Sequence, residues 1–235
     1  EIIEVATFRA APHTGKEDGE SEDDIDATGR LLSDNVFGSQ ADDAVRRDIT
    51  VNALYYDITD FSVKDYVGGV ADLKAGVLRM IGDPQTRFRE DPVRMLRVLR
   101  FAAKLGFKLD AATAAPLHEL GHLLLNVSPA RLFEEVLKLF HTGYALETYE
   151  LLRHYDLFRF LFPRTDESLA GEEQNFPRVL LPQALANTDL RIEQGKPVNP
   201  AFLFAAMLWE PVRLSMLRRI AQGAHPVEAL MQAGE

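Results

Sequence analysis

The sequence changes character at Gly82. Before it, short segments rich in β-branched and aromatic residues alternate with turn signals, and residues 2–8 and 76–82 are the clearest strand candidates. After it, apolar residues recur at helical spacing between turns that contain Pro or Gly. Strands followed by helices are typical of an α+β protein. We therefore expect a mixed sheet with helices over residues 1–85, followed by an all-helical remainder.

The composition excludes several classes of protein. With 46% hydrophobic residues, a chain of 235 residues can bury a core without covalent staples. It contains no cysteine, which excludes a disulfide scaffold, a Cys-ligated metal site and a thiol nucleophile. No apolar run approaches the roughly 18 residues of a membrane span, so no membrane partner is expected. These features favour a cytoplasmic protein.

The charge is distributed unevenly along the chain. The formal net charge of −10 argues against a nucleic-acid partner, because phosphate binding needs a basic surface. However, residues 1–45 carry twelve acids and three bases, a net of −9, and much of this acidity lies in an expected loop at 10–43. Residues 46–110 carry nine acids and twelve bases, a net of +3. The middle of the chain is therefore locally basic.

One helix after Gly82 has clear signals at both ends. Asp91 suits the N-cap, Pro92 the first helical position, and Gly106 the C-cap. Further helices are expected at 132–140, 145–155 and 202–208, and a polar loop at 164–178.

Basic residues follow one face of this helix. Arg94, Arg97 and Arg100 recur every three residues, and Lys104 follows four further on. Asp91 lies three residues before Arg94, so a carboxylate and a guanidinium project from the same side of the helix start. Such a pair can match the Watson–Crick edge of adenine or cytosine, each of which presents an amino donor beside a ring-nitrogen acceptor. A solvated amphipathic helix is the alternative interpretation.

Two other positions are candidates on weaker grounds. In the triplet Arg46-Arg47-Asp48, two guanidiniums suit a polyphosphate and the carboxylate suits a ribose hydroxyl, although a surface ion-pair network explains the same pattern. Glu4 lies in an apolar, strand-like run and either faces solvent or serves as an inward metal ligand.

A zinc-protease pattern also occurs in the chain. His118, Glu119 and His122 match His-Glu-x-x-His, in which two histidines four apart on a helix bind zinc. The expected third ligand and glycine turn do not follow, so we interpret this match as a coincidence.

Three motifs in order carry a resemblance to a known family. They are Arg46-Arg47-Asp48-Ile49-Thr50-Val51-Asn52-Ala53-Leu54, then Asp65-Tyr66-Val67-Gly68-Gly69-Val70-Ala71-Asp72-Leu73, then Arg87-Phe88-Arg89-Glu90-Asp91-Pro92-Val93-Arg94-Met95-Leu96-Arg97. Together they resemble the class II nucleotidyltransferases, the family of poly(A) polymerases and CCA-adding enzymes. The long insert at 10–43 and the pair Tyr55-Tyr56 are similar to the bacterial poly(A) polymerase branch.

The resemblance implies a fold and a division into parts. A partial nucleotidyltransferase head, a mixed sheet with helices that includes the acidic loop 10–43, would span residues 1–85. A helical neck that reads the nucleotide would span 86–140, and a helical body would span 141–235.

The resemblance also implies site residues. Nucleotide-binding roles fall on Arg46, Arg47, Asp48, Asn52, Glu90, Asp91, Arg94 and Arg97. Glu4 would be a catalytic residue and a ligand of Mg²⁺. The family's paired Asp-x-Asp carboxylates are not in this chain, and two-metal catalysis needs them. We therefore expect the 235-residue piece to be inactive alone.

The implied activity is template-independent transfer of AMP from ATP to RNA 3′ ends, as in RNA polyadenylation and mRNA processing. The alternatives are a CCA-adding tRNA nucleotidyltransferase, which would also use CTP, and a catalytically dead relative that still binds RNA. The sequence does not indicate an oligomeric state.

Overall fold

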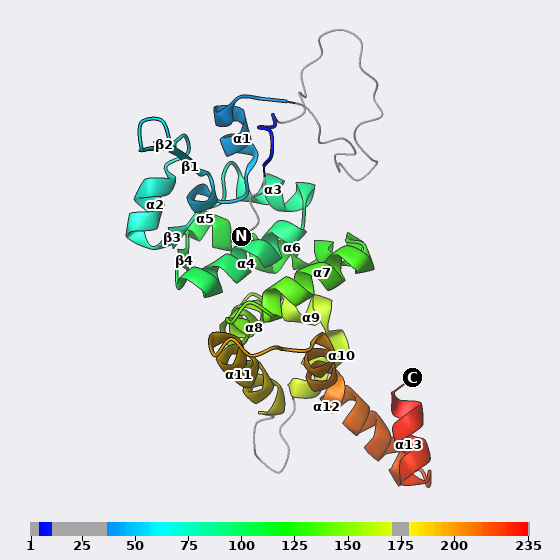
Figure 1. Cartoon of the computed structure of the whole chain (residues 1–235). Helices are drawn as coiled ribbons and strands as arrows, with labels where there is room; N and C mark the ends of the chain where they lie inside the picture. The colour runs from blue at the N-terminus through cyan, green and yellow to red at the C-terminus, as the bar shows by residue number, and fades with distance from the viewer. Residues whose placement is uncertain (1–4, 11–36, 171–178, 235) are drawn as a thin grey trace. The chain divides into compact units, whose positions relative to one another are not determined.

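The computed structural model describes residues 5–10, 37–170 and 179–234 (Figure 1). The chain divides into two compact units, residues 1–123 and 124–235. All strands of the described residues lie in the first unit, and the second is built from helices. The α+β prediction is thus confirmed. The predicted divisions at residues 85 and 140 stay predictions.

The strands of the first unit form two small sheets. β1 (Leu54–Asp57) pairs with β2 (Ser62–Asp65) in antiparallel orientation, and Leu54 lies opposite Asp65. β3 (Val77–Leu78) pairs with β4 (Lys108–Leu109) in parallel orientation. An isolated antiparallel bridge joins Ile49 to Met80, so the segment before β1 lies beside the segment after β3.

The helices follow in chain order. In the first unit they are α1 (Gln40–Arg46), α2 (Gly69–Ala75), α3 (Pro84–Glu90), α4 (Val93–Leu105), α5 (Ala111–Ala114) and α6 (Leu117–Leu120). In the second they are α7 (Pro129–Phe140), α8 (Ala145–His154), α9 (Phe158–Leu161), α10 (Pro163–Leu169), α11 (Leu180–Glu193), α12 (Pro200–Ala221) and α13 (Pro226–Ala233). The described residues also form the short 3₁₀ helices η2 (Thr50–Asn52) and η3 (Gly121–Asn126).

Two predictions near the N-terminus need correction. The predicted strand at 2–8 is wrong for residues 5–8, which are not in a strand. Among the described residues near this end of the chain, pairing is limited to a single bridge between Arg9 and Phe37. A β-rich composition does not make a strand without a partner to complete the ladder. The predicted loop at 10–43 gives way to α1, whose N-cap Ser39 forms a capping box with Asp42. Residues 1–4 and 11–36 lie outside the described part of the chain.

The basic helix α4 confirms the predicted C-terminus but not the predicted start. Gly106 ends it at φ 63°, and its amide bonds back to Ala102 and Ala103. The start is different because residues 84–90 already form α3, with Asp91 as its C-cap. A proline disfavours helical torsions in the residue before it, so α3 ends before Asp91 and α4 begins after Pro92.

In the second unit, the three predicted helices are present within α7, α8 and α12. The predicted loop at 164–178 is wrong for 164–169, which belong to α10; residues 171–178 are outside the described part. This helix buries polar Thr165 and Ser168, and the Thr165 hydroxyl donates to the Met207 carbonyl of α12 at 2.9 Å. Because its buried side chains are polar, the segment lacks the apolar periodicity that would have indicated a helix.

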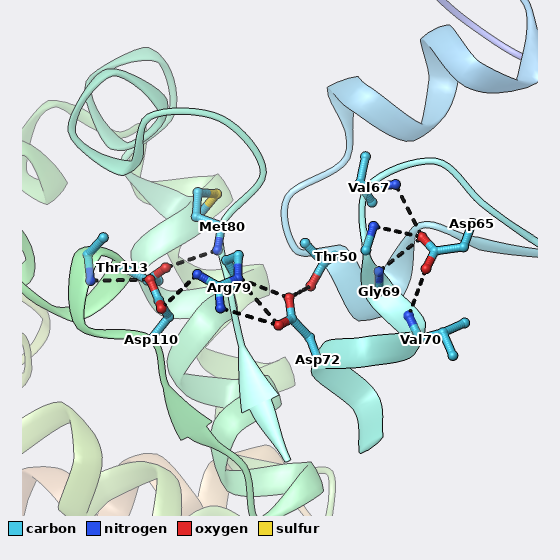
Figure 2. Close-up of polar contacts among 12 residues, drawn as sticks. Thr50, Asp65, Val67, Gly69, Val70, Asp72, Arg79, Met80, Asp110 and Thr113 are labelled. Carbon is cyan, nitrogen blue, oxygen red and sulfur yellow. Dashed lines mark hydrogen bonds and ion pairs between the residues drawn. The ribbon is translucent and has the colours of Figure 1, made fainter. Parts of the chain in front are cut away.

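Asp65 caps α2 with four hydrogen bonds (Figure 2). Its carboxylate accepts from the backbone N–H groups of Val67, Gly68, Gly69 and Val70 at 2.9–3.1 Å. A carboxylate there satisfies amides that the first helical turn leaves without partners and complements the helix dipole. Desolvation raises the pKa of Asp65, but the backbone hydrogen bonds outweigh it, so the pKa is lowered overall. The Asp-Tyr-Val-Gly-Gly motif therefore begins a helix.

Gly69 brings α2 against η2. A Cβ at position 69 would clash with the carbonyl oxygen of Thr50. The Thr50 hydroxyl donates to Asp72 of α2 at 2.7 Å, and Arg79 joins Asp72 to Asp110 (Figure 2). These contacts fix the residues that immediately follow Asp48.

We predict that Gly69→Ala lowers the free energy of unfolding by about 3 kcal/mol, because the new methyl group overpacks a backbone contact. Gly68→Ala, at φ 83° with open space around it, should cost only about 1 kcal/mol through left-handed strain. Urea unfolding followed by circular dichroism measures both. Equal costs would contradict the close approach of Gly69 to Thr50.

Candidate functional site

Asp48 occupies the centre of the predicted site. Its carbonyl accepts from the Ile81 N–H at 3.0 Å, and the Thr50 N–H donates to the Arg79 carbonyl at 3.0 Å. Ile49 between them is fully buried. The backbone at Asp48 is therefore fixed on both sides by the segment after β3.

Two arginines of α4 bind the Asp48 carboxylate. Arg94 Nε lies 3.1 Å from Oδ1, and Arg97 Nη2 lies 2.7 Å from Oδ2. The Asp48 side chain is only 12% exposed. Since residues three apart share a helix face, the spacing seen in the sequence places both guanidiniums on one carboxylate. The Arg-Arg-Asp segment is thus joined to the arginine helix.

Glu90 extends this network toward α3. Arg94 Nη1 donates to Glu90 Oε2 at 2.8 Å and to the Arg87 carbonyl at 2.9 Å. Arg87 Nη1 lies 3.1 Å from the same Glu90 oxygen. Neighbouring Asp91 accepts from the Val93 N–H at 3.2 Å, at the start of α4. The structure therefore brings together the predicted residues Asp48, Glu90, Arg94 and Arg97, with Asp91 adjoining them in the chain.

Arg47 is held by a separate set of contacts. Its Nε and Nη2 each lie 3.0 Å from Asp43 Oδ2, and its guanidinium lies 5.5 Å from the centre of the Tyr55 ring. Arg47 Nη1 donates to the Asn52 carbonyl at 3.4 Å, so predicted Asn52 contributes its backbone. Arg46 is tied in through its carbonyl, which accepts from Arg87 at 2.7 Å.

Sequence reasoning missed Asp43, Tyr55 and Arg87 as site residues. Asp43 lies four residues before Arg47 on a helix, which is a usable ion-pair signal. The Tyr55 hydroxyl donates to Asp43 at 2.7 Å, and β1 supplies this contact from another part of the chain. No local pattern shows that Arg87 is bonded to backbone carbonyls 40 or more residues away.

These contacts shift two pKa values. Burial raises the pKa of Asp43, but hydrogen bonds from Tyr55, the Arg9 N–H and Arg47 outweigh it, so the pKa is lowered overall. Burial and the bond to Asp43 raise the pKa of Tyr55. At neutral pH the pair is therefore an ionised carboxylate and a neutral phenol.

The predicted Mg²⁺ site falls largely outside what the structure covers. Glu4 lies outside the described residues, and within them no group of three or more His, Asp or Glu side chains could hold a metal ion. His118 and His122 form no such group either, since α6 ends at Leu120 and His122 Nδ1 lies 2.9 Å from the Glu119 carbonyl. The described residues by themselves do not provide the donor set of a two-metal site.

Comparisons with known proteins match both units. The model for the poly(A) polymerase head domain matches residues 1–79, and the model described as a probable RNA- and SrmB-binding site of polymerase A matches 106–169. Over 222 residues the chain is 52% identical to poly(A) polymerase I of Escherichia coli O6:H1, a match covering 94% of this chain and 47% of the relative. The chain belongs to the nucleotidyltransferase family of poly(A) polymerases and CCA-adding enzymes.

The chain is also similar to a CCA-adding enzyme and to a tRNA-processing enzyme. A CCA-adding enzyme of Bacillus pumilus is 37% identical over 143 residues, which cover 61% of this chain and 36% of the enzyme. A solved apo structure of a tRNA-processing enzyme superposes with a TM-score of 0.57 at 26% identity, covering 84% of this chain and 53% of that one. The nucleotidyltransferase fold is thus confirmed. The chain spans about half the length of the curated poly(A) polymerases it matches.

One further observation concerns membranes. Among residues 5–10, 37–170 and 179–234, no helix combines the length and apolarity that crossing a bilayer requires.

We predict that Asp43→Asn lowers the free energy of unfolding at pH 7 and makes it fall less as the pH is lowered. The folded-state pKa of Asp43 is below its unfolded value of about 3.9. Its stabilisation is therefore complete above about pH 5 and is lost as pH falls through the folded pKa. Urea unfolding between pH 7 and pH 3 should show a smaller decline in the variant than in the wild type. Exposed Glu119→Gln is the control, and a parallel decline in wild type and Asp43→Asn would refute this role.

Proposed function

We propose that this chain supplies the nucleotide-binding part of a template-independent polynucleotide adenylyltransferase, which adds AMP from ATP to RNA 3′ ends. The observation that carries the proposal is the Asp48 carboxylate between Arg94 and Arg97, which joins the Arg-Arg-Asp and Glu-Asp-x-x-Arg motifs into one site. The 52% identity to a poly(A) polymerase supports the choice of reaction.

In this reaction the RNA 3′-hydroxyl attacks the α-phosphate of ATP and pyrophosphate leaves. Arg46 and Arg47 would bind the phosphates as cations that also offer planar pairs of donors. Asp48 and Asn52 would contact the ribose side of the nucleotide. Asp43 and the Tyr55 ring hold the Arg47 guanidinium in place, which limits the rotamer entropy that binding would cost.

Base choice would depend on Asp91 and Arg94. Adenine presents an amino donor beside a ring acceptor, which a carboxylate and a guanidinium can match. Arg94 is fixed by bonds to Asp48, Glu90 and the Arg87 carbonyl, so its plane is set before a nucleotide binds. A fixed donor edge can discriminate between bases without a template, because a mismatched base leaves buried polar groups unpaired.

Metal-dependent catalysis belongs to the same proposal. Mg²⁺ as cofactor and Glu4 as a catalytic ligand stay predictions, as do the cytoplasmic setting and a role in mRNA processing. RNA is the proposed second substrate, with residues 106–169 as the segment that matches an RNA-binding model. We expect the 235-residue chain alone to bind nucleotide without extending RNA.

CCA addition is the second candidate, and the match to the Bacillus pumilus enzyme supports it. Incubating the complete enzyme with tRNA and each nucleotide separates the two. Incorporation of CTP at the tRNA end would favour CCA addition, whereas extension by ATP alone favours polyadenylation. Binding of RNA and nucleotide without extension would point to the catalytically dead relative.

We predict that the chain binds ATP with a dissociation constant of about 1 μM to 1 mM and prefers it to CTP. Asp91→Ala should reduce the preference for ATP over GTP by roughly tenfold, since guanine presents a carbonyl where adenine presents the amino donor that a carboxylate accepts from. RNA binding should change little. Competition against a fluorescent ATP analogue measures the preference, and a labelled oligonucleotide measures RNA binding. Asp60→Ala, at the exposed turn between β1 and β2, is the matched control, and an unchanged preference in Asp91→Ala would remove the base-reading role.

A further inference from the structure

The guanidinium of Arg87 binds the C-terminal end of α1. Its Nη2 donates to the carbonyls of Arg46 and Arg47 at 2.7 and 2.9 Å. These carbonyls lie at the end of a helix, where backbone acceptors lack helical partners and the dipole favours a cation. Arg87 thus holds the backbone of the proposed phosphate-binding pair rather than any side chain of it.

The other side of the same guanidinium binds the base-reading motif. Nη1 of Arg87 lies 3.1 Å from Glu90 Oε2, and that oxygen also binds Arg94 at 2.8 Å. Arg94 in turn binds Asp48, the residue next to Arg47. The contacts form a closed ring from the Arg47 backbone through Arg87, Glu90 and Arg94 to Asp48.

The ring depends on the Arg87 guanidinium, whose burial costs desolvation free energy. The Arg87 side chain is 15% exposed, and its Nε is buried without a hydrogen-bond partner. Burial, and then repulsion from Arg94, lower its pKa. A buried ionic group is a poor source of stability compared with apolar packing, and its best-attested use is to specify one arrangement of the groups around it.

We propose that Arg87 is a positioning residue that sets the spacing between the phosphate-binding pair, Arg46 and Arg47, and the base-reading residue Arg94. A nucleotide spans the two, so its affinity and its base choice both depend on that spacing. The affinity of an ion that occupies only the phosphate end does not depend on that spacing. This inference rests on the proposed nucleotide-binding function.

The test compares two kinds of probe, an inorganic polyphosphate and nucleotides, on the 235-residue chain. Inorganic tripolyphosphate reports on the phosphate pair alone, and ATP and CTP report on the whole span. In Arg87→Met we expect ATP affinity and the preference for ATP over CTP to fall roughly tenfold each, because misplaced groups lose their alignment. Tripolyphosphate affinity should stay within about twofold of wild type.

Arg87→Lys covers the case in which the methionine variant does not fold. An ammonium can still bind the two carbonyls but cannot offer the planar fork that also spans Glu90. We expect a melting temperature near that of wild type and an intermediate ATP preference. Arg89→Met, whose side chain is 52% exposed and 3.9 Å from Glu119, is the matched control and should behave as wild type.

The outcomes separate the two proposals. If wild type binds neither ATP nor tripolyphosphate, the proposed function fails and this inference fails with it. If wild type binds ATP and the folded Arg87 variants keep its full preference for ATP over CTP, only the positioning role is overturned. Equal losses for ATP and tripolyphosphate would show a general structural role and would overturn it as well.

Discussion

The candidate site of this protein depends on one carboxylate between two guanidiniums. Asp48 comes from the segment after α1, whereas Arg94 and Arg97 come from α4, almost fifty residues later in the chain. A largely buried carboxylate without partners would cost free energy of folding. Asp48 therefore requires the two arginines that bind it. The three-residue spacing on α4 and the fixed backbone at Asp48 are what allow both ion pairs to form.

The surrounding elements keep this carboxylate in place. The Ile49–Met80 bridge fixes its backbone. Thr50, two residues after Asp48, donates its hydroxyl to Asp72, which also binds Arg79 (Figure 2). Several residues of the sequence motifs therefore hold the structure around Asp48 in place. Asp65 and Gly69 belong to the second motif and form no described bond with a predicted site residue, yet they determine where α2 packs.

Local signals predicted the parts of the fold that local physics decides. Gly106 ended α4 as expected because a left-handed C-cap depends on a single residue, and the Arg94–Arg97 pair followed from helical spacing alone. Helices α3 and α10 were not predicted, and α4 begins one residue after the predicted first position. The signal for α10 is weak because the side chains it buries are threonine and serine. Arg87 could not be singled out, since its partners are backbone carbonyls brought close only by folding.

The close packing of Gly69 on Thr50 has a consequence for substitution at position 69. A side chain at position 69 would push against the backbone of Thr50, two residues after Asp48. A substitution in α2 would therefore displace the Asp48 carboxylate, although α2 contributes no side chain to the candidate site. The size limit at position 69 is therefore as strict as at a residue of the candidate site. That limit is set by the position that η2 must keep beside Asp48, and not by what α2 itself does.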